Sequence, residues 1–203
     1  MRALAGALVL ALLGGCATWP FGQRAQPEPQ PVLPDHRAAV AALDDWRLTG
    51  KLAVQRADQG VSATLEWHEQ GERFDLRLVA PLSGGTFKLT GDAGRVALFT
   101  PEGEMFTAAS AGDLVEAHLG WRLPVEGARW WVRGIPAPGS AAAQERRDAQ
   151  GRWTDFAQDG WRISILDYHE RAQPHLPRKL YLARDDLQVR LVIRHWQLDV
   201  GAP

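Results

Sequence analysis

Residues 46–54, with the sequence WRLTGKLAV, carry the pattern that decides the fold. Apolar or small residues occupy every second position of this stretch: Trp46, Leu48, Gly50, Leu52 and Val54. A period of two is typical of a β-strand with one buried and one solvent-facing side. The alternation returns in residues 61–68, 74–78, 87–89 and 96–98, and Gly60, Gly71 and residues 91–94 separate these segments. The sequence therefore predicts an antiparallel meander.

Helical patterns interrupt the predicted strands. An apolar stripe predicts a short helix in residues 35–45, and an S-x-x-D start signal predicts another in residues 110–120. A further helix is expected in residues 126–133. Strands are then expected in residues 152–156, 161–168, 179–184 and 187–198. The predicted class is mainly β with helical inserts (α+β), either a sheet curled around a filled or ligand-holding interior with helices as a plug, or a closed sandwich.

Composition limits the classes of function. The 203 residues correspond to one domain, 45% of them are hydrophobic, and the formal net charge is −1. Because phosphate contacts need a basic excess, this near-neutral charge argues against nucleic acid as a partner. The single cysteine excludes an intramolecular disulfide and a multi-cysteine zinc site. Nine tryptophans indicate that large amphipathic rings are needed somewhere in the molecule.

That cysteine lies in a lipoprotein signal. Arg2 precedes an apolar run over residues 3–13, which as a helix of roughly 16 Å is too short to cross a membrane and suits a signal peptide. The sequence LGGC at residues 13–16 matches the bacterial lipobox. We therefore expect residues 1–15 to be a signal peptide and Cys16 to be the lipidation site that anchors the protein to a membrane.

The segment that follows the cysteine predicts a tether and the membrane in which the protein is anchored. Ala17 replaces the Asp that would retain a lipoprotein at the inner membrane, which indicates the outer membrane, with the domain facing the periplasm. Residues 19–34 hold five of the thirteen prolines and favour an extended chain. The sequence thus predicts a lipidated, proline-rich tether over residues 16–34 and a folded domain over residues 35–203.

Catalytic motifs are absent from the sequence. It contains no nucleophile elbow, phosphate-binding loop, zinc-protease helix or dinucleotide-binding loop, and its six histidines show no metal-ligand spacing. We expect no catalytic residues, no metal and no cofactor. A lipid-modifying enzyme that uses His68 or His118 is the remaining enzymatic alternative.

An ordered set of short motifs resembles the LolB family of outer-membrane lipoproteins. The set runs from about Trp46 to Trp196, behind the lipobox. Its members are WRLTGKLAV (46–54), LEW (65–67), PL (81–82), GWRLPV (120–125), WVRG (131–134), QDGW (158–161), LP (176–177) and Trp196. Each motif is short, and their common order makes the resemblance specific.

The resemblance implies a receptor that accepts lipoproteins from the periplasmic carrier LolA and places them in the outer membrane. The family fold is an incomplete, strongly curved antiparallel β-barrel with helices as a lid, and its apolar interior holds acyl chains without using a nucleotide. The implied partners are LolA, the acyl chains of cargo lipoproteins and outer-membrane phospholipid, and the protein is expected to be a monomer. A membrane-anchored scaffold that binds an envelope protein without lipid transfer is the alternative.

The resemblance also implies a membrane-insertion loop at Pro81, Leu82, Ser83 and Gly84, with Leu82 as the inserting residue. Ser83 departs from the commoner Pro-Leu-Gly pattern, which puts the turn in question and not the leucine. The residue types agree with an exposed loop, because proline lacks a ladder donor and glycines favour turns.

Twelve apolar residues are candidates for the wall of an acyl-chain cavity: Leu52, Leu65, Trp67, Leu76, Leu78, Phe87, Leu89, Ile163, Ile165, Leu191, Ile193 and Trp196. Large rings with Leu and Ile would give such a cavity apolar walls. A receptor for acyl chains is expected to hold an apolar cavity of roughly several hundred Å³. The sequence does not separate such a cavity from a packed core.

Overall fold

The alternation that begins at Trp46 continues through a single antiparallel sheet. The computed structural model describes residues 35–57, 59–80, 85–92, 94–119, 124–171 and 173–198. Within these ranges the strands are β1 (Asp45–Arg56), β2 (Gln59–Gln70), β3 (Arg73–Ala80), β4 (Gly85–Gly91), β5 (Val96–Phe99), β6 (Met105–Ala108), β7 (Ala143–Arg147), β8 (Trp153–Gln158), β9 (Trp161–Tyr168), β10 (Pro177–Arg184) and β11 (Leu187–Leu198). The order in space is β6-β5-β4-β3-β2-β1-β11-β10-β9-β8-β7.

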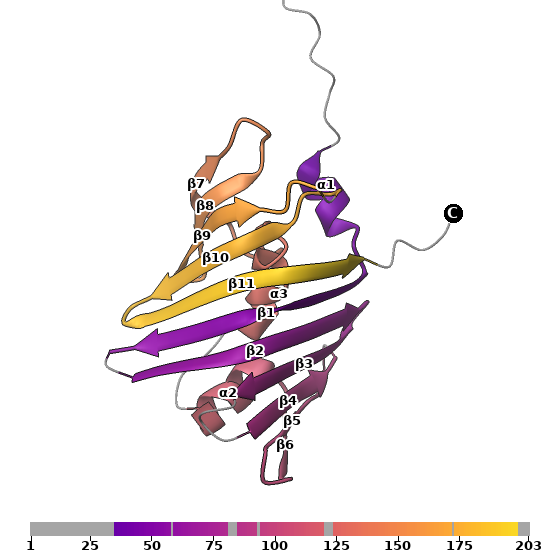
Figure 1. Cartoon of the computed structure of the whole chain (residues 1–203), viewed down its shortest axis with the longest axis vertical. Helices are drawn as coiled ribbons and strands as arrows, with labels where there is room; N and C mark the ends of the chain where they lie inside the picture. The colour runs from indigo at the N-terminus through magenta and orange to yellow at the C-terminus, as the bar shows by residue number, and fades with distance from the viewer. Residues whose placement is uncertain are drawn as a thin grey trace, which may run out of the picture. The chain divides into compact units, whose positions relative to one another are not determined.

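The pairing of β1 with β11 joins the two halves of the sheet (Figure 1). This pairing shifts register between Thr49 and Gly50. A Cβ on Gly50 would lie 2.5 Å from the Val192 carbonyl oxygen, so only glycine allows this close approach. The outermost strands β6 and β7 end the sheet instead of closing it. An incomplete, curled barrel is therefore confirmed, and the closed sandwich is wrong.

Three helices complete the described part of the chain: α1 (His36–Ala41), α2 (Ala111–Leu119) and α3 (Val125–Trp131). The Asp35 side chain caps α1 by accepting a bond from the Arg37 N–H at 3.0 Å. The Glu126 carboxylate accepts bonds from Ala111 N–H and Gly112 N–H, so α3 supplies the cap for the first turn of α2. Figure 1 shows α3 on one face of the sheet, behind β1 and β11.

The inward residues of the strands form one apolar core with the helices. Burial alternates along β2, where Ala63, Leu65 and Trp67 are buried, and in the same way along β9 and β11. The most deeply buried large side chains are tryptophans: Trp46, Trp131, Trp153 and Trp161. Four of the nine tryptophans are therefore explained by packing alone.

Several predicted boundaries were wrong. The helix expected over residues 35–45 ends at Ala41, because β1 already begins at Asp45. Gly60 lies inside β2, and the chain turns between β1 and β2 at Ala57, which has a φ of 50°. The strands β6 and β7 were not predicted. Their side chains are exposed or half-buried at the edges of the sheet, so the pattern of residue types is weak.

Candidate functional site

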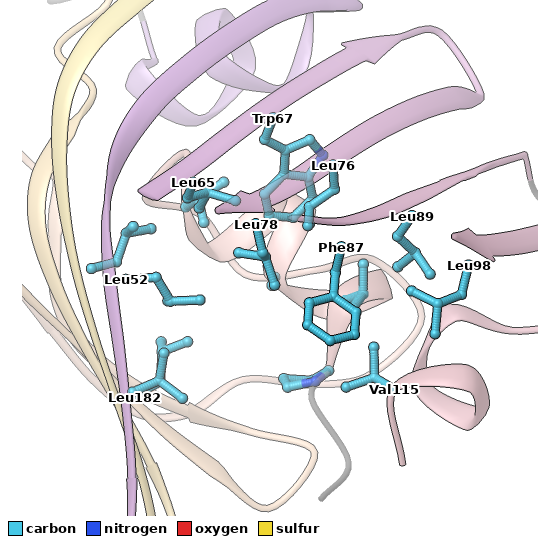
Figure 2. A pocket seen from close by; sticks show the side chains of 16 residues that line it. Leu52, Leu65, Trp67, Leu76, Leu78, Phe87, Leu89, Leu98, Val115 and Leu182 are labelled. Atoms are coloured by element: carbon cyan, nitrogen blue, oxygen red, sulfur yellow. The ribbon is translucent and has the colours of Figure 1, made fainter. Parts of the chain in front are cut away.

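An apolar pocket lies between the inner face of the sheet and the helices (Figure 2). The pocket is partly open, and its volume is about 90 Å³. The lining residues are Leu52, Leu65, Trp67, Leu76, Leu78, Phe87, Leu89, Leu98, Val115, Pro124, Val125, Ala128, Val132, Leu182, Val189 and Leu191. The sheet supplies most of this wall, and α2 and α3 supply the opposite side. Such a site can bind hydrocarbon and offers no group for chemistry.

Only one of these lining side chains carries a polar atom, the indole nitrogen of Trp67. That N–H donates to the Glu69 carboxylate at 3.0 Å. Glu69 is the next inward residue of β2 and is 2% exposed. Because the donor is already bonded to Glu69, the pocket presents no unmet hydrogen bond to a ligand.

The Glu69 carboxylate connects the sheet to α3. Arg129 donates to Glu69 at 2.8 Å and to the Gly71 carbonyl at 2.9 Å. Arg133, one turn further along the chain, donates to the carbonyls of Val40 and Leu43 at 3.2 and 3.0 Å. These bonds fix the helix that forms part of the pocket wall. This cluster was not predicted from the sequence, although position 69 continues the inward series 61, 63, 65 and 67.

Burial dominates the electrostatics of this cluster. It raises the pKa of the Glu69 carboxyl above its usual value, although the Arg129 guanidinium and the Trp67 N–H both act to lower it. Burial and the neighbouring Arg129 lower the pKa of Arg133 to about 10, so this guanidinium is still charged at neutral pH. Arg133 also lies over the Trp130 ring, 4.4 Å from its centroid.

We expect Glu69→Gln to change how stability depends on pH. Because the carboxyl pKa is raised in the folded state, the unfolded chain loses its proton first, and stability falls as pH rises from about 4.3 through the folded pKa. Glutamine keeps an acceptor for the Trp67 N–H and does not ionise. The thermal midpoint of the native protein should therefore fall relative to the variant as pH rises. If the thermal midpoint of the native protein instead rises relative to that of the variant as pH increases, the ion pair with Arg129 outweighs the effect of burial on Glu69.

The structure places eight of the twelve candidate cavity residues in the pocket wall: Leu52, Leu65, Trp67, Leu76, Leu78, Phe87, Leu89 and Leu191. Ile163, Ile165 and Ile193 are buried in the core away from this wall. Trp196 is half-buried, donates to the Pro177 carbonyl at 2.9 Å and packs on Trp46. The period of two identifies the inward face of a strand, but it does not say which part of that face borders a cavity.

The other eight lining residues were missed: Leu98, Val115, Pro124, Val125, Ala128, Val132, Leu182 and Val189. Leu98, Leu182 and Val189 are inward strand residues that alternation could have found. The five remaining residues lie on α2, on α3 or next to it. Their position follows from how the helices pack on the sheet.

Two other sequence predictions fall outside the described residues. These are the lipidation site Cys16 and the loop Pro81–Gly84. The ends of the strands that this loop connects are described. Ala80 and Gly85 are cross-strand partners, so residues 81–84 join the two strands of a hairpin.

The histidines of the enzymatic alternative lie in separate places. His68 Nε2 is 3.1 Å from Asp45 Oδ1 on the outer face of the sheet, whereas the His118 ring of α2 packs against Phe106 at 4.0 Å. Over the described ranges, no group of three or more His, Cys, Asp or Glu side chains could hold a metal ion. Among the helices in these ranges, none is long and apolar enough to span a membrane.

The curled sheet with helices over an apolar pocket places the chain in a known class of incomplete β-barrels. The fold is similar to that of a LolA superfamily protein from Nitrosomonas europaea, with a TM-score of 0.51 at 8% identity over 83% of this chain and 92% of that one. A DUF1329 family protein from Desulfovibrio piger gives a TM-score of 0.52 at 10% identity over 82% and 90% of the two chains.

Sequence similarity identifies the family within this class. Residues 44–196 match the family model described as outer membrane lipoprotein LolB. Curated proteins named outer-membrane lipoprotein LolB are similar over nearly their whole length. The one from Nitrosococcus oceani is 38% identical over 93% of this chain and 94% of its own, and that from Stutzerimonas stutzeri is 39% identical over 96% and 94%. The chain belongs to the LolB family of outer-membrane lipoproteins.

Proposed function

We propose that this outer-membrane lipoprotein receives other lipoproteins from the periplasmic carrier LolA, holds their acyl chains in the apolar pocket and inserts them into the outer membrane. One observation carries the proposal: all sixteen lining residues are apolar, and the one polar side-chain atom among them is bonded to Glu69. Such a wall suits hydrocarbon and rejects charged ligands. The proposed activity is transfer without catalysis, so it assigns no catalytic residue and no cofactor.

The size of the pocket implies that it widens when cargo enters. Its volume of about 90 Å³ is below the several hundred Å³ expected from sequence. A dry cavity of roughly 150 Å³ accommodates a single benzene, and an acyl chain is much larger. We therefore expect the lining side chains or the helices to move when an acyl chain is enclosed. Because Glu126 caps α2 from α3, these two helices are coupled where they border the pocket.

Without a nucleotide as energy source, the direction of cargo transfer depends on the relative affinities of carrier and receptor for the acyl chains. Cargo passes from carrier to receptor when the receptor binds the acyl chains more tightly. A tenfold preference requires about 1.4 kcal/mol, which corresponds to roughly 55 Å² of additional apolar burial. A few lining side chains could supply this difference once the pocket has widened.

Crosslinking tests the proposal directly. A photoreactive benzophenone residue at Phe87, in the pocket wall, should crosslink to the acyl chains of a lipoprotein supplied on LolA. The matched control is Lys88, the next residue of β4, whose side chain pairs with Asp75 on the outer face. A crosslink at 87 and none at 88 is the expected result. Equal labelling at both positions, or none at 87, would favour the scaffold without lipid transfer.

The proposal includes the domain assignment, with a signal peptide over residues 1–15, a lipidated tether over 16–34 and the folded domain over 35–203. We expect Cys16→Ala to prevent lipidation and release the protein from the outer membrane with its fold intact, because the described core begins after the tether. Radiolabelled palmitate and membrane fractionation measure this outcome. Label still incorporated into the variant would show that another residue is acylated.

A further inference from the structure

Four cations surround an exposed valine on the sheet face opposite the pocket. We call Lys51, Lys179, Arg190 and Arg194 the cation ring, and Val192 lies at its centre. Val192 of β11 pairs with Lys51 of β1 on one side and Lys179 of β10 on the other. Arg190 and Arg194 precede and follow it by two residues. All four cations are exposed, and Val192 is 39% exposed. Directly opposed side chains in a sheet are roughly 5 Å apart, so the charges form one cluster.

None of the described carboxylates forms an ion pair with the cation ring. The Lys51 ammonium donates to Thr64 Oγ1 at 2.6 Å, and the Arg190 guanidinium lies 6.0 Å from the centre of the Tyr181 ring. The neighbouring carboxylates have their own partners: Glu66 pairs with Arg77 and Asp75 with Lys88, and Asp167, the cross-strand neighbour of Lys179, pairs with Arg178. Like charges side by side destabilise a sheet, so this unpaired cluster calls for an anionic partner.

We propose that the cation ring docks on the anionic phospholipid of the membrane that carries the lipid anchor. This inference rests on the proposed function, and it adds the orientation of the domain relative to the membrane. The ring lies on β1, β11 and β10, near the middle of the eleven-stranded order, so a flat surface that approaches the outer, convex face meets these strands first. The exposed Val192 adds a small apolar contact among the charges, as a bilayer interface allows.

Four exposed carboxylates lie on the helix side of the domain: Glu102 and Glu104 between β5 and β6, and Asp113 and Glu116 on α2. An anionic surface therefore attracts the ring. While the domain is docked in this way and awaits cargo, its pocket faces away from the membrane and toward an arriving carrier, and delivery requires the domain to reorient.

Fluorescence quenching in vesicles tests this orientation. The full lipidated protein is reconstituted in phosphatidylcholine vesicles with or without phosphatidylglycerol, with a quencher on the lipid headgroups. Fluorophores are attached in separate samples to Thr49→Cys, exposed beside the ring, and to Ala117→Cys, exposed on α2. Phosphatidylglycerol should increase quenching at position 49 and not at 117, and added salt should reverse the increase.

Replacing all four ring cations with glutamine should abolish the increase. Each cation near an anionic surface contributes roughly a fivefold bias, so the docked-to-free ratio should fall by roughly several hundredfold at low salt. The matched control replaces four exposed arginines outside the ring with glutamine: Arg73, Arg95, Arg146 and Arg171. This control has the same net charge and should keep the increase.

Two results would overturn the inference. If phosphatidylglycerol does not change the quenching at position 49, the partner of the ring is an acidic protein and not the membrane. If both fourfold variants lose the increase equally, net charge alone causes it. Neither result bears on the pocket, because this measurement uses no cargo. Crosslinking at position 87 tests the proposed function separately, and it should be unchanged in the ring variant.

Discussion

Leu78→Glu should abolish the acceptance of lipoproteins while leaving the protein folded and anchored. Leu78 lines the pocket on β3 and is only half-buried, so a carboxylate can stay hydrated there while the pocket is empty. An acyl chain in the pocket would strip that water, and the effective penalty of burying an unpaired charge is several kcal/mol. Transfer from LolA in a purified assay should therefore fall by roughly a hundredfold or more.

The matched control for this variant is Val79→Glu. Val79 follows Leu78 on β3, is also half-buried and faces the outer side of the sheet, where it pairs with Thr64 and Thr86. Its carboxylate adds the same charge without entering the pocket, so acceptance should stay near the native level. Thermal unfolding of both variants checks the fold. A folded Leu78→Glu protein that accepts cargo at the native rate would exclude this pocket as the binding site.

Trp67 is a poorer position for such a test, because its ring belongs to both pocket and core. It lines the cavity, lies 5.5 Å from the Trp46 ring and donates to Glu69. Removal of a buried tryptophan side chain costs about 3–5 kcal/mol of stability. It would also leave Glu69 without one of its two hydrogen-bonding partners. A loss of acceptance in Trp67→Ala would therefore not separate binding from folding.

Alternation predicted the central strands because their two faces meet different surroundings. Leu65 and Trp67 are buried, whereas Glu66 between them is exposed, and the residue types report this directly. Gly60 was misread as a turn residue, because a glycine pattern does not tell a turn from a strand position. The edge strands β6 and β7 lack a buried face, so the same signal is missing there.

The pocket was predicted only in part, because its boundaries depend on packing between distant segments. Leu65 and Ile163 both lie on inward faces, and only Leu65 borders the cavity. The difference arises from where α2 and α3 rest on the sheet. The contact that fixes α3 joins Glu69 and Arg129, sixty residues apart in sequence. No local pattern reports such a pair, although a glutamate at an inward strand position indicates that a buried partner exists.

Delivery of cargo to the membrane is a separate step from acceptance. A substitution at Leu82, in the connection between β3 and β4, can distinguish the two steps. β3 ends at Ala80 and β4 begins at Gly85, its cross-strand partner, so the connection joins these two strands at one end of the hairpin. The antiparallel topology places it at the same end as the connection between β5 and β6, and a Cβ on Gly85 would lie 2.7 Å from Pro101 of that connection. We propose that Leu82, between these strands, contacts the bilayer.

Leu82→Glu should leave acceptance near normal and block delivery, so that cargo stays on the receptor. A leucine that moves fully from water into an apolar environment gains about 1.5–3 kcal/mol, and a carboxylate at the same place would have to be desolvated instead. The domain should stay folded, because the neighbouring Pro81, Ser83 and Gly84 are residue types that favour an exposed loop. Transfer from LolA and release into liposomes are measured separately, and Leu82→Phe, which keeps an apolar side chain, should deliver like the native protein. Native-rate delivery by Leu82→Glu would show that insertion does not depend on this loop.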